Sequence, residues 1–399
     1  MTGASVTRRL LFARVAVNAV FACFGITLAT WAVHLPALQH ATGMSTAMLG
    51  TVLLVSGTGA LVGMQVCGPL SDRIGSTRIA LVAGAVMALA VMIPLSATTA
   101  LWAACGAFLF GIATGSADVA MNAAAVSLER AYGRPIMSSF HAVFSLGSVL
   151  GSLLATVGFA LHASTVTASG AVGLLCVVMI VAVSRWLLDT EIFTTAARED
   201  PEDPDERTGA DGVEDGGKPP LRRILLLGTL AFLLLFSEGA AMDWSSLHAQ
   251  RHLGASPTGG AIAFGVFVTA MTVGRLCADR IAHRIGAVAL LRRGSALAVA
   301  GIALVIFAPN LPVTLLGWLL AGLGLAGGLP QVFTAAGNVG VASGRVLARV
   351  VGMGYVALMS GPALIGWLAE LISLNSALVL PMCAVAVCVL AASTVAPRK

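Results

Sequence analysis

The segment VGMQVCGPLSDRIG, from Val62 to Gly75, returns later in the chain as VGRLCADRIAHRIG, from Val273 to Gly286. In both copies an apolar stretch ends in Arg-Ile-Gly, which reads as a positively charged turn. A repeat of this kind indicates two copies of one structural unit. Because the copies lie in opposite halves of the 399 residues, each unit occupies one half of the chain.

The composition is that of a protein whose main solvent is the lipid bilayer. Hydrophobic residues make up 58% of the chain, charged residues only 10%, and the mean hydropathy is +0.94. A water-soluble domain of this length carries far more polar residues. The sequence therefore predicts an all-α membrane protein with twelve transmembrane helices in two pseudo-symmetric six-helix halves. The predicted helices lie at 11–36, 47–70, 79–97, 101–126, 136–161, 168–188, 222–247, 258–281, 288–308, 311–337, 344–371 and 375–396.

Arg and Lys gather in the loops expected on one side of the membrane, including both chain ends. The loops of the opposite side carry almost none, and Arg251 is the exception. Because cytoplasmic loops retain basic residues, both termini are expected in the cytoplasm. This pattern predicts a multi-pass membrane protein with an even number of spans.

The stretch between the sixth and seventh helices differs from the rest of the chain. It is acidic, contains Gly and Pro, and has almost no large apolar residue. Such a composition cannot bury a core, so a flexible cytoplasmic linker is expected, with a regulatory segment as the alternative. The predicted organisation is an N-terminal half at 1–188, the linker at 189–221 and a C-terminal half at 222–399.

Several function classes find no support in the residues. The seven cysteines all fall within predicted helices and are expected to be apolar packing residues, with no disulfide or metal framework. No metalloprotease, serine-hydrolase or phosphate-binding motif occurs, so neither catalytic residues nor a cofactor is predicted. The net charge of +5 comes from the cytoplasmic loops and indicates contact with anionic lipid, not nucleic acid.

The first copy of the repeat contains Gly68-x-Leu70-x-Asp72-Arg73-x-Gly75-x-x-Arg78. This pattern resembles the loop signature between the second and third helices of the major facilitator superfamily, and the layout of two six-helix halves is similar as well. The resemblance implies transport by alternating access. It also implies that Asp72 is similar to a latch, which interacts with the positive N-terminal end of a helix in the other half.

The resemblance extends to a gating motif in both copies. The second copy places His283 where the first has Asp72, so a matching latch is not expected there. The arginines of the motif have an alternative role as positive-inside anchors. The predicted gating residues are Gly68, Asp72, Arg73, Gly75, Arg78, Arg284 and Gly286.

Three further segments, at 115–122, 139–147 and 238–244, resemble a bacterial branch near the fucose-permease group. That resemblance implies a proton symporter of the bacterial cytoplasmic (inner) membrane. It also implies an acidic residue on the fourth helix, the position that Asp118 holds. The drug-antiporter branch is less similar, because no Arg begins the fourth helix.

Polar groups at membrane depth carry the predicted chemistry, since a charge at a helix centre costs about 2.5–3.5 kcal/mol on a translocon scale. Asp118 and Asn122 share one face of the fourth helix, and His141 and Ser145 share one face of the fifth. We expect these helices to be antiparallel neighbours, with Asp118 within reach of His141. Such a pair can exchange protons near neutral pH, and a static hydrogen-bonded pair is the alternative.

Glu238 on the seventh helix is the other proton-coupling candidate, near the middle of the membrane. Asp243 is expected to cap or anchor the outer end of that helix. Arg275 needs an anionic partner, which is either a carboxylate of the other half or the substrate, unless it snorkels to the interface. The remaining candidates for the substrate cavity, each with packing as the alternative, are Gln331, Tyr355 and Asn18.

These features predict a secondary active transporter that moves a small polar solute, such as a sugar or a related metabolite, together with protons. Two alternatives are a proton-driven exporter of amphipathic compounds or drugs, and a non-transporting membrane receptor with a transporter fold. The expected partners are the small-molecule substrate, protons and membrane lipid, and the expected assembly is a monomer.

Overall fold

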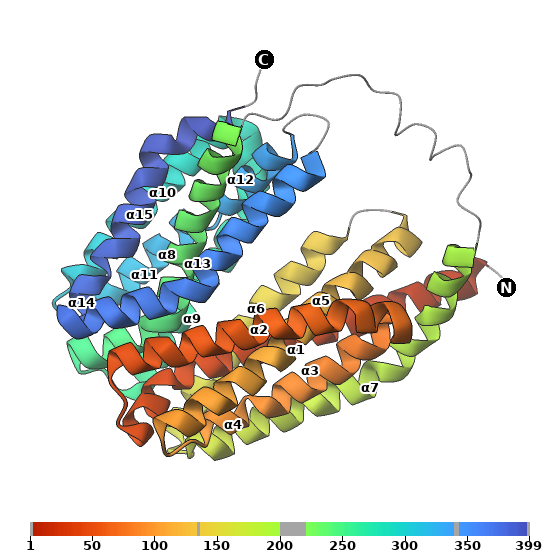
Figure 1. Cartoon of the computed structure of the whole chain (residues 1–399), viewed down its shortest axis with the longest axis horizontal. Helices are drawn as coiled ribbons and strands as arrows, with labels where there is room; N and C mark the ends of the chain where they lie inside the picture. Colours follow the sequence, from red (N-terminus) through yellow and green to blue (C-terminus); the bar gives the residue numbers. More distant parts are fainter. Residues whose placement is uncertain (1–2, 134–135, 200–220, 339–342, 397–399) are drawn as a thin grey trace.

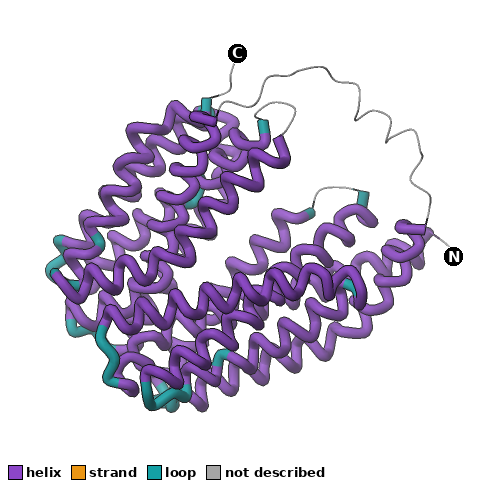
Figure 2. Tube along the Cα trace, viewed as in Figure 1, coloured by secondary structure: helices purple, strands orange, loops and turns teal. Residues whose placement is uncertain are grey.

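The structure is a computed structural model that describes residues 3–133, 136–199, 221–338 and 343–396. At some positions within these ranges, Asp72 among them, only the backbone is described. The described residues form helices joined by short loops, with no strand among them (Figure 2). Within this described part, twelve helical spans are long and apolar enough to cross a membrane, which confirms the predicted fold class.

The first six spans form one bundle. Their helices are α1 (Gly3–Thr42), α2 (Thr46–Ile74), α3 (Ser76–Ala90) with the short α4 (Met92–Leu95), α5 (Ala100–Tyr132), α6 (Met137–Ala160) and α7 (Thr165–Glu199). The helix α7 continues past residue 188 into the stretch expected to be linker. Residues 200–220 of that predicted linker lie outside the described part of the chain.

The last six spans form the second bundle. They consist of α8 (Leu221–Leu253), α9 (Pro257–Ile285), α10 (Ala287–Ile306), α11 (Leu311–Leu325) with α12 (Gly328–Gly337), α13 (Ser343–Leu371), and α14 (Leu374–Ala377) with α15 (Val379–Ala391) and the 3₁₀ turn η2 (Ala392–Val395). Three predicted spans are thus interrupted: 79–97, 311–337 and 375–396.

The sequence repeat is visible in the local geometry of the two bundles. Gly75 and Gly286 have φ angles of 98° and 82°, which suit a residue without a side chain, and each ends one helix and precedes the next. Ser45 and Ser256 cap α2 and α9, each accepting a backbone N–H at 3.2 Å. Equivalent residues therefore form equivalent turns and caps in the two halves.

Helix packing in the first bundle separates α5 from α6. A Cβ atom at Gly115 of α5 would overlap the carbonyl oxygen of Ala60 on α2, so these two backbones approach as closely as small residues allow. The helix α5 packs mainly on α2 and α3, whereas α6 packs on α1 and α9. The prediction that α5 and α6 are close neighbours is therefore wrong, because other helices occupy the packing face of each.

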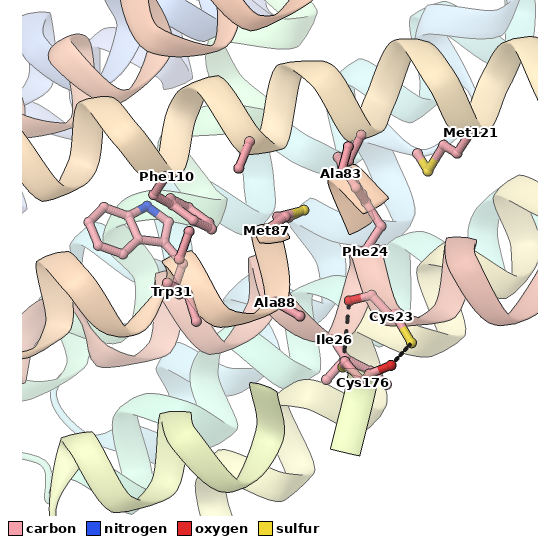
Figure 3. Packing of buried hydrophobic residues seen from close by; sticks show 14 of the residues in the cluster. Cys23, Phe24, Ile26, Trp31, Ala83, Met87, Ala88, Phe110, Met121 and Cys176 are labelled. Atoms are coloured by element: carbon pink, nitrogen blue, oxygen red, sulfur yellow. Dashed lines mark hydrogen bonds between the residues drawn. The ribbon is translucent and has the colours of Figure 1, made fainter. Parts of the chain in front are cut away.

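The core of the first bundle contains aromatic and sulfur-containing side chains (Figure 3). Trp31 of α1 lies beside Phe110 of α5, with 5.4 Å between the ring centroids. The thiol of Cys23 on α1 lies 3.6 Å from the carbonyl oxygen of Cys176 on α7, and both side chains are buried. All seven cysteines are free thiols.

The two bundles diverge toward the end of the molecule that carries the chain termini, and they meet at the opposite end (Figure 1). There the start of α2 contacts the end of α13 so closely that a Cβ atom at Gly50 would touch the backbone of Pro362 and Gly366. The indole nitrogen of Trp367 donates to the Thr51 hydroxyl at 3.1 Å.

Two more hydrogen bonds join the bundles at the same end. The backbone N–H of Ala47 donates to the Glu370 carboxylate at 3.3 Å, and Arg251 of α8 donates to the Thr46 hydroxyl at 3.2 Å. We call this contact the distal seal. Its residues are Thr46, Ala47, Gly50, Thr51, Arg251, Pro362, Gly366, Trp367 and Glu370.

Candidate functional site

A cavity of about 460 Å³ lies between the two bundles. The first bundle lines it with α1, α2, α5 and α6, and the second with α8, α9 and α13. A cavity of this volume is in the range that holds a small molecule. Its polar lining consists of Ser56, Thr114, Asp118, His141, Ser145, Ser148, Glu238, Asp243, Thr272, Arg275 and Tyr355.

Most of the remaining lining is apolar, with aromatic and methionine side chains prominent. Both bundles supply these side chains, so an enclosed solute meets rings and thioethers on either side. The aromatic and methionine residues of the lining are Phe24, Trp31, Met64, Phe110, Met121, Phe144, Met242, Phe267, Met271 and Met359, in addition to Tyr355.

Glu238 and Arg275 form an ion pair in the cavity wall. The guanidinium of Arg275 on α9 donates to Glu238 Oε1 on α8 at 2.7 Å, and 35% of the arginine and 13% of the glutamate side chain are exposed. Both residues belong to the second bundle. The alternative that Arg275 pairs with a carboxylate of the other half is therefore wrong, because α8 and α9 are packed together and supply a nearer partner.

Asp118 on α5 also lines the cavity, but it is held by a neutral group. The Asn122 amide, one helical turn further, donates to the Asp118 carboxylate at 3.1 Å and to its backbone carbonyl at 2.8 Å. Because both residues are on α5, this hydrogen bond orients the carboxylate without joining two helices.

His141 lines the cavity from α6, with its ring edge-on to Phe21 at 5.5 Å between centroids. Ser145, one turn further, donates to the His141 carbonyl at 3.1 Å. No hydrogen bond joins Asp118 to His141 among the described residues, although both face the same cavity. They share the cavity without a hydrogen bond because α5 and α6 pack mainly on different helices.

Asp243 lines the cavity as well, which differs from its expected role at a helix end. The helix α8 continues to Leu253, because the residues after Asp243 are buried in helical packing instead of meeting the outer interface. The interpretation of Asp243 as a helix cap is therefore wrong. Its side chain has no hydrogen-bond partner in the described part of the chain.

Of the other residues predicted to line the cavity, some do and some do not. Tyr355 on α13 lines the cavity and is 43% exposed. Asn122, Gln331 and Asn18 do not line it. The amide of Asn122 is turned to Asp118, and the side-chain oxygen of Asn18 is buried without a partner among the described residues.

Several hydroxyl groups of the lining were not among the sequence candidates. Thr114 lies one turn before Asp118, and Ser148 lies about one turn after Ser145. Helical spacing from the charged residues would have placed both on the cavity face. Thr272 likewise lies about one turn before Arg275 on α9, whereas Ser56 on α2 has no predicted cavity residue on its own helix to indicate it.

The family model of the Major Facilitator Superfamily matches residues 15–340. The chain belongs to the major facilitator superfamily. It is 32% identical over 367 residues to an uncharacterized MFS-type transporter of Yersinia pestis, with 91% of each chain covered. It is 35% identical over 379 residues to an uncharacterized transporter of Sinorhizobium fredii, with 91% of this chain and 93% of the relative covered.

Solved structures share the fold of this superfamily member. A D-xylose-proton symporter superposes with a TM-score of 0.72 and 16% identity, covering 96% of this chain and 97% of its own. Family and relatives together make the protein a multi-pass membrane transporter and not an enzyme.

The superfamily motif lies at the end of the molecule where the bundles diverge. Arg73 and Arg284 are exposed, and Gly75 and Gly286 form the turns after α2 and α9. Among the described residues, no atom of another helix lies within 4 Å of a Cβ built at Gly68, so this glycine is not at a close helix contact in this conformation. The side chain of Asp72 lies outside the described residues, and the latch stays a prediction.

Proposed function

We propose that this transporter moves a small polar solute together with protons by alternating access, and that Asp118 carries the coupling proton. The observation that carries the proposal is the contrast between the two candidate carboxylates. Glu238 is paired with a cation at 2.7 Å, whereas Asp118 faces the cavity with only a neutral amide as its partner.

The pairing decides which carboxylate can titrate during transport. A cation within hydrogen-bond distance favours the ionised form of a carboxylate, which makes the paired Glu238 the weaker candidate for a proton that is bound and released in each cycle. A carboxylate with an amide partner lacks that support. Its proton affinity then follows the hydration of the cavity, which changes when the cavity opens to one side or the other.

The arrangement of the bundles is consistent with this cycle. The distal seal closes one end, and the bundles diverge at the end that carries the termini. With the termini in the cytoplasm of a bacterial cell, as the basic loops predict, this conformation faces inward. We propose the same orientation, an inner-membrane location, a monomer, and a linker between the halves at 189–221.

A solute screen and a flux assay test the proposal. Thermal-shift measurements on the purified protein against pentoses, hexoses, amino sugars, organic acids and drugs identify a solute, beginning with D-xylose because a solved structural relative is named as its proton symporter. Proteoliposomes with an imposed pH gradient then measure accumulation. Gradient-driven accumulation is expected. Binding without flux under any gradient would favour the receptor alternative and contradict the proposal.

The apolar lining favours a second candidate function, the export of amphipathic compounds. Phe24, Phe144 and Met242 belong to a wall that suits an apolar solute surface. The same proteoliposome assay separates the two functions. A symporter accumulates solute when protons flow into the vesicles, whereas a proton-exchanging exporter accumulates it when protons flow out.

A further inference from the structure

Asp243 is the cavity carboxylate whose charge no described side chain balances. Among the described residues, three carboxylates line the cavity: Asp118, Glu238 and Asp243. Glu238 takes the guanidinium of Arg275, and Asp118 takes the amide of Asn122. Asp243 has neither a cation nor a hydrogen-bond donor within reach in the described part of the chain.

Acidic groups therefore outnumber basic groups in the cavity lining. Against the three carboxylates stand one arginine and His141, which faces the cavity from the other bundle. Because the arginine is engaged by Glu238, an ionised Asp243 leaves an uncompensated negative charge in the cavity wall. Charges of opposite sign attract strongly in a poorly hydrated site, and a like charge in the same place is repelled.

The surroundings suit an organic cation. Trp31 and Phe110 lie 5.4 Å apart in the wall, and Phe144 and Phe267 face the same cavity. Aromatic faces attract ammonium groups, and methionine side chains adapt to apolar ones. A carboxylate without a partner among such side chains is a typical arrangement for binding an amine.

We infer that Asp243 binds a positively charged group, a protonated amine, of the transported solute. The inference deepens the proposed function, on which it rests, by naming the class of solute: an amine-bearing compound is accepted and a carboxylate-bearing one is rejected. Asp118 keeps the coupling proton in this scheme, and Asp243 selects the solute.

Charged thiol reagents test the inference without a known solute. A cysteine replaces Met242, which neighbours Asp243 and lines the cavity, in a background whose seven native cysteines are removed. The rate of modification is measured with a cationic trimethylammonioethyl and an anionic sulfonatoethyl methanethiosulfonate. The cation is expected to react faster, and Asp243→Asn is expected to lower the ratio of the two rates about tenfold.

Two variants serve as controls. Glu370→Gln removes one carboxylate outside the cavity and should leave the ratio within about twofold. Asp118→Asn removes a carboxylate of the same cavity and should change the ratio less than Asp243→Asn does. A Met64→Cys reporter on α2 repeats the measurement from the other bundle.

Each other outcome overturns the inference. If Asp243→Asn leaves the ratio of the two modification rates unchanged, Asp243 carries no charge in the cavity. If Asp118→Asn changes the ratio as much as Asp243→Asn does, the preference for the cationic reagent does not come from Asp243. Failure of both reagents at both reporters would mean that the site is not reached from solution. None of these results depends on flux, so loss of the proposed coupling role of Asp118 is recognised separately.

Discussion

Arg275 of α9 is hydrogen-bonded to Glu238 of α8 across 2.7 Å, within one bundle and in the wall of the cavity. The ion pair therefore links two adjacent helices of the second half instead of the two halves. Because Arg275 is engaged in this pair, the carboxylates of Asp118 and Asp243 have no cationic partner among the described residues.

Breaking this ion pair should destabilise the protein. Arg275→Met leaves Glu238 without its cation and is expected to cost about 1–3 kcal/mol of unfolding free energy, the lower part of the range because 35% of the arginine side chain is exposed. Melting temperature in detergent measures the loss. The double variant Arg275→Met with Glu238→Gln should recover part of it, and an unchanged melting temperature in the single variant would argue that the pair is only a snorkelling contact.

Replacing Asp118 by Asn should uncouple transport from the proton gradient. The amide imitates the protonated carboxylate, so solute binding and counterflow are expected to persist while uphill, gradient-driven accumulation is lost. Proteoliposomes with an imposed pH gradient provide the measurement, with Glu238→Gln as the matched variant. Full accumulation by Asp118→Asn would move the coupling role to Glu238.

The hydrogen bond between Trp367 and Thr51 should bias the conformational equilibrium. Trp367→Phe keeps an aromatic ring but removes the indole donor, so the distal seal is expected to weaken by about 0.5–1.5 kcal/mol. The population of molecules that are open at the distal seal would then rise about two- to tenfold. The measurement is the rate at which a thiol reagent added on the side of the seal modifies a Ser56→Cys reporter. Thr51→Val should give a similar rise, and the two variants combined should not add, since they remove the same bond.

Close packing of α2 on α5 should make Gly115 intolerant of a side chain. A Cβ atom there overlaps the Ala60 carbonyl, so Gly115→Ala is expected to lower the melting temperature clearly. Gly68→Ala is the control on the neighbouring helix, because nothing lies within 4 Å of its Cβ position and alanine is the better helix former. Equal melting temperatures for the two variants would contradict this account of the α2 and α5 contact.

Asp72 provides a test of the predicted latch. If its carboxylate holds the cytoplasmic gate closed in one state, Asp72→Asn should leave the protein folded and raise the labelling of a cavity cysteine from the cytoplasmic side. The measurement is the labelling rate in oriented vesicles, and intact transport with unchanged labelling would remove the latch from the mechanism.

The charged side chains allowed the cavity to be predicted from the sequence, but not the contacts within it. Their presence at membrane depth indicated a cavity, because a charge in lipid is too costly to be tolerated without a function. Six of the nine residues expected at the cavity do line it: Asp118, His141, Ser145, Glu238, Arg275 and Tyr355. Their partners were not predictable, since periodicity reports the face of a helix and not the helix that packs against that face. Asp243 was misassigned for a related reason. The helix α8 continues to Leu253 because the residues after Asp243 are buried against other helices, and the sequence does not show that burial.

Hydropathy and the repeat were sufficient for the twelve spans and the two similar units, because both follow from interactions within a segment. A helix in a bilayer must satisfy its own backbone hydrogen bonds, and equal turn sequences give equal turns, as Gly75 and Gly286 show. The pairing of Glu238 with Arg275, the separation of α5 from α6 and the distal seal between α2 and α13 required the three-dimensional arrangement. Each depends on which helices touch, and that is decided by the packing of all of them together.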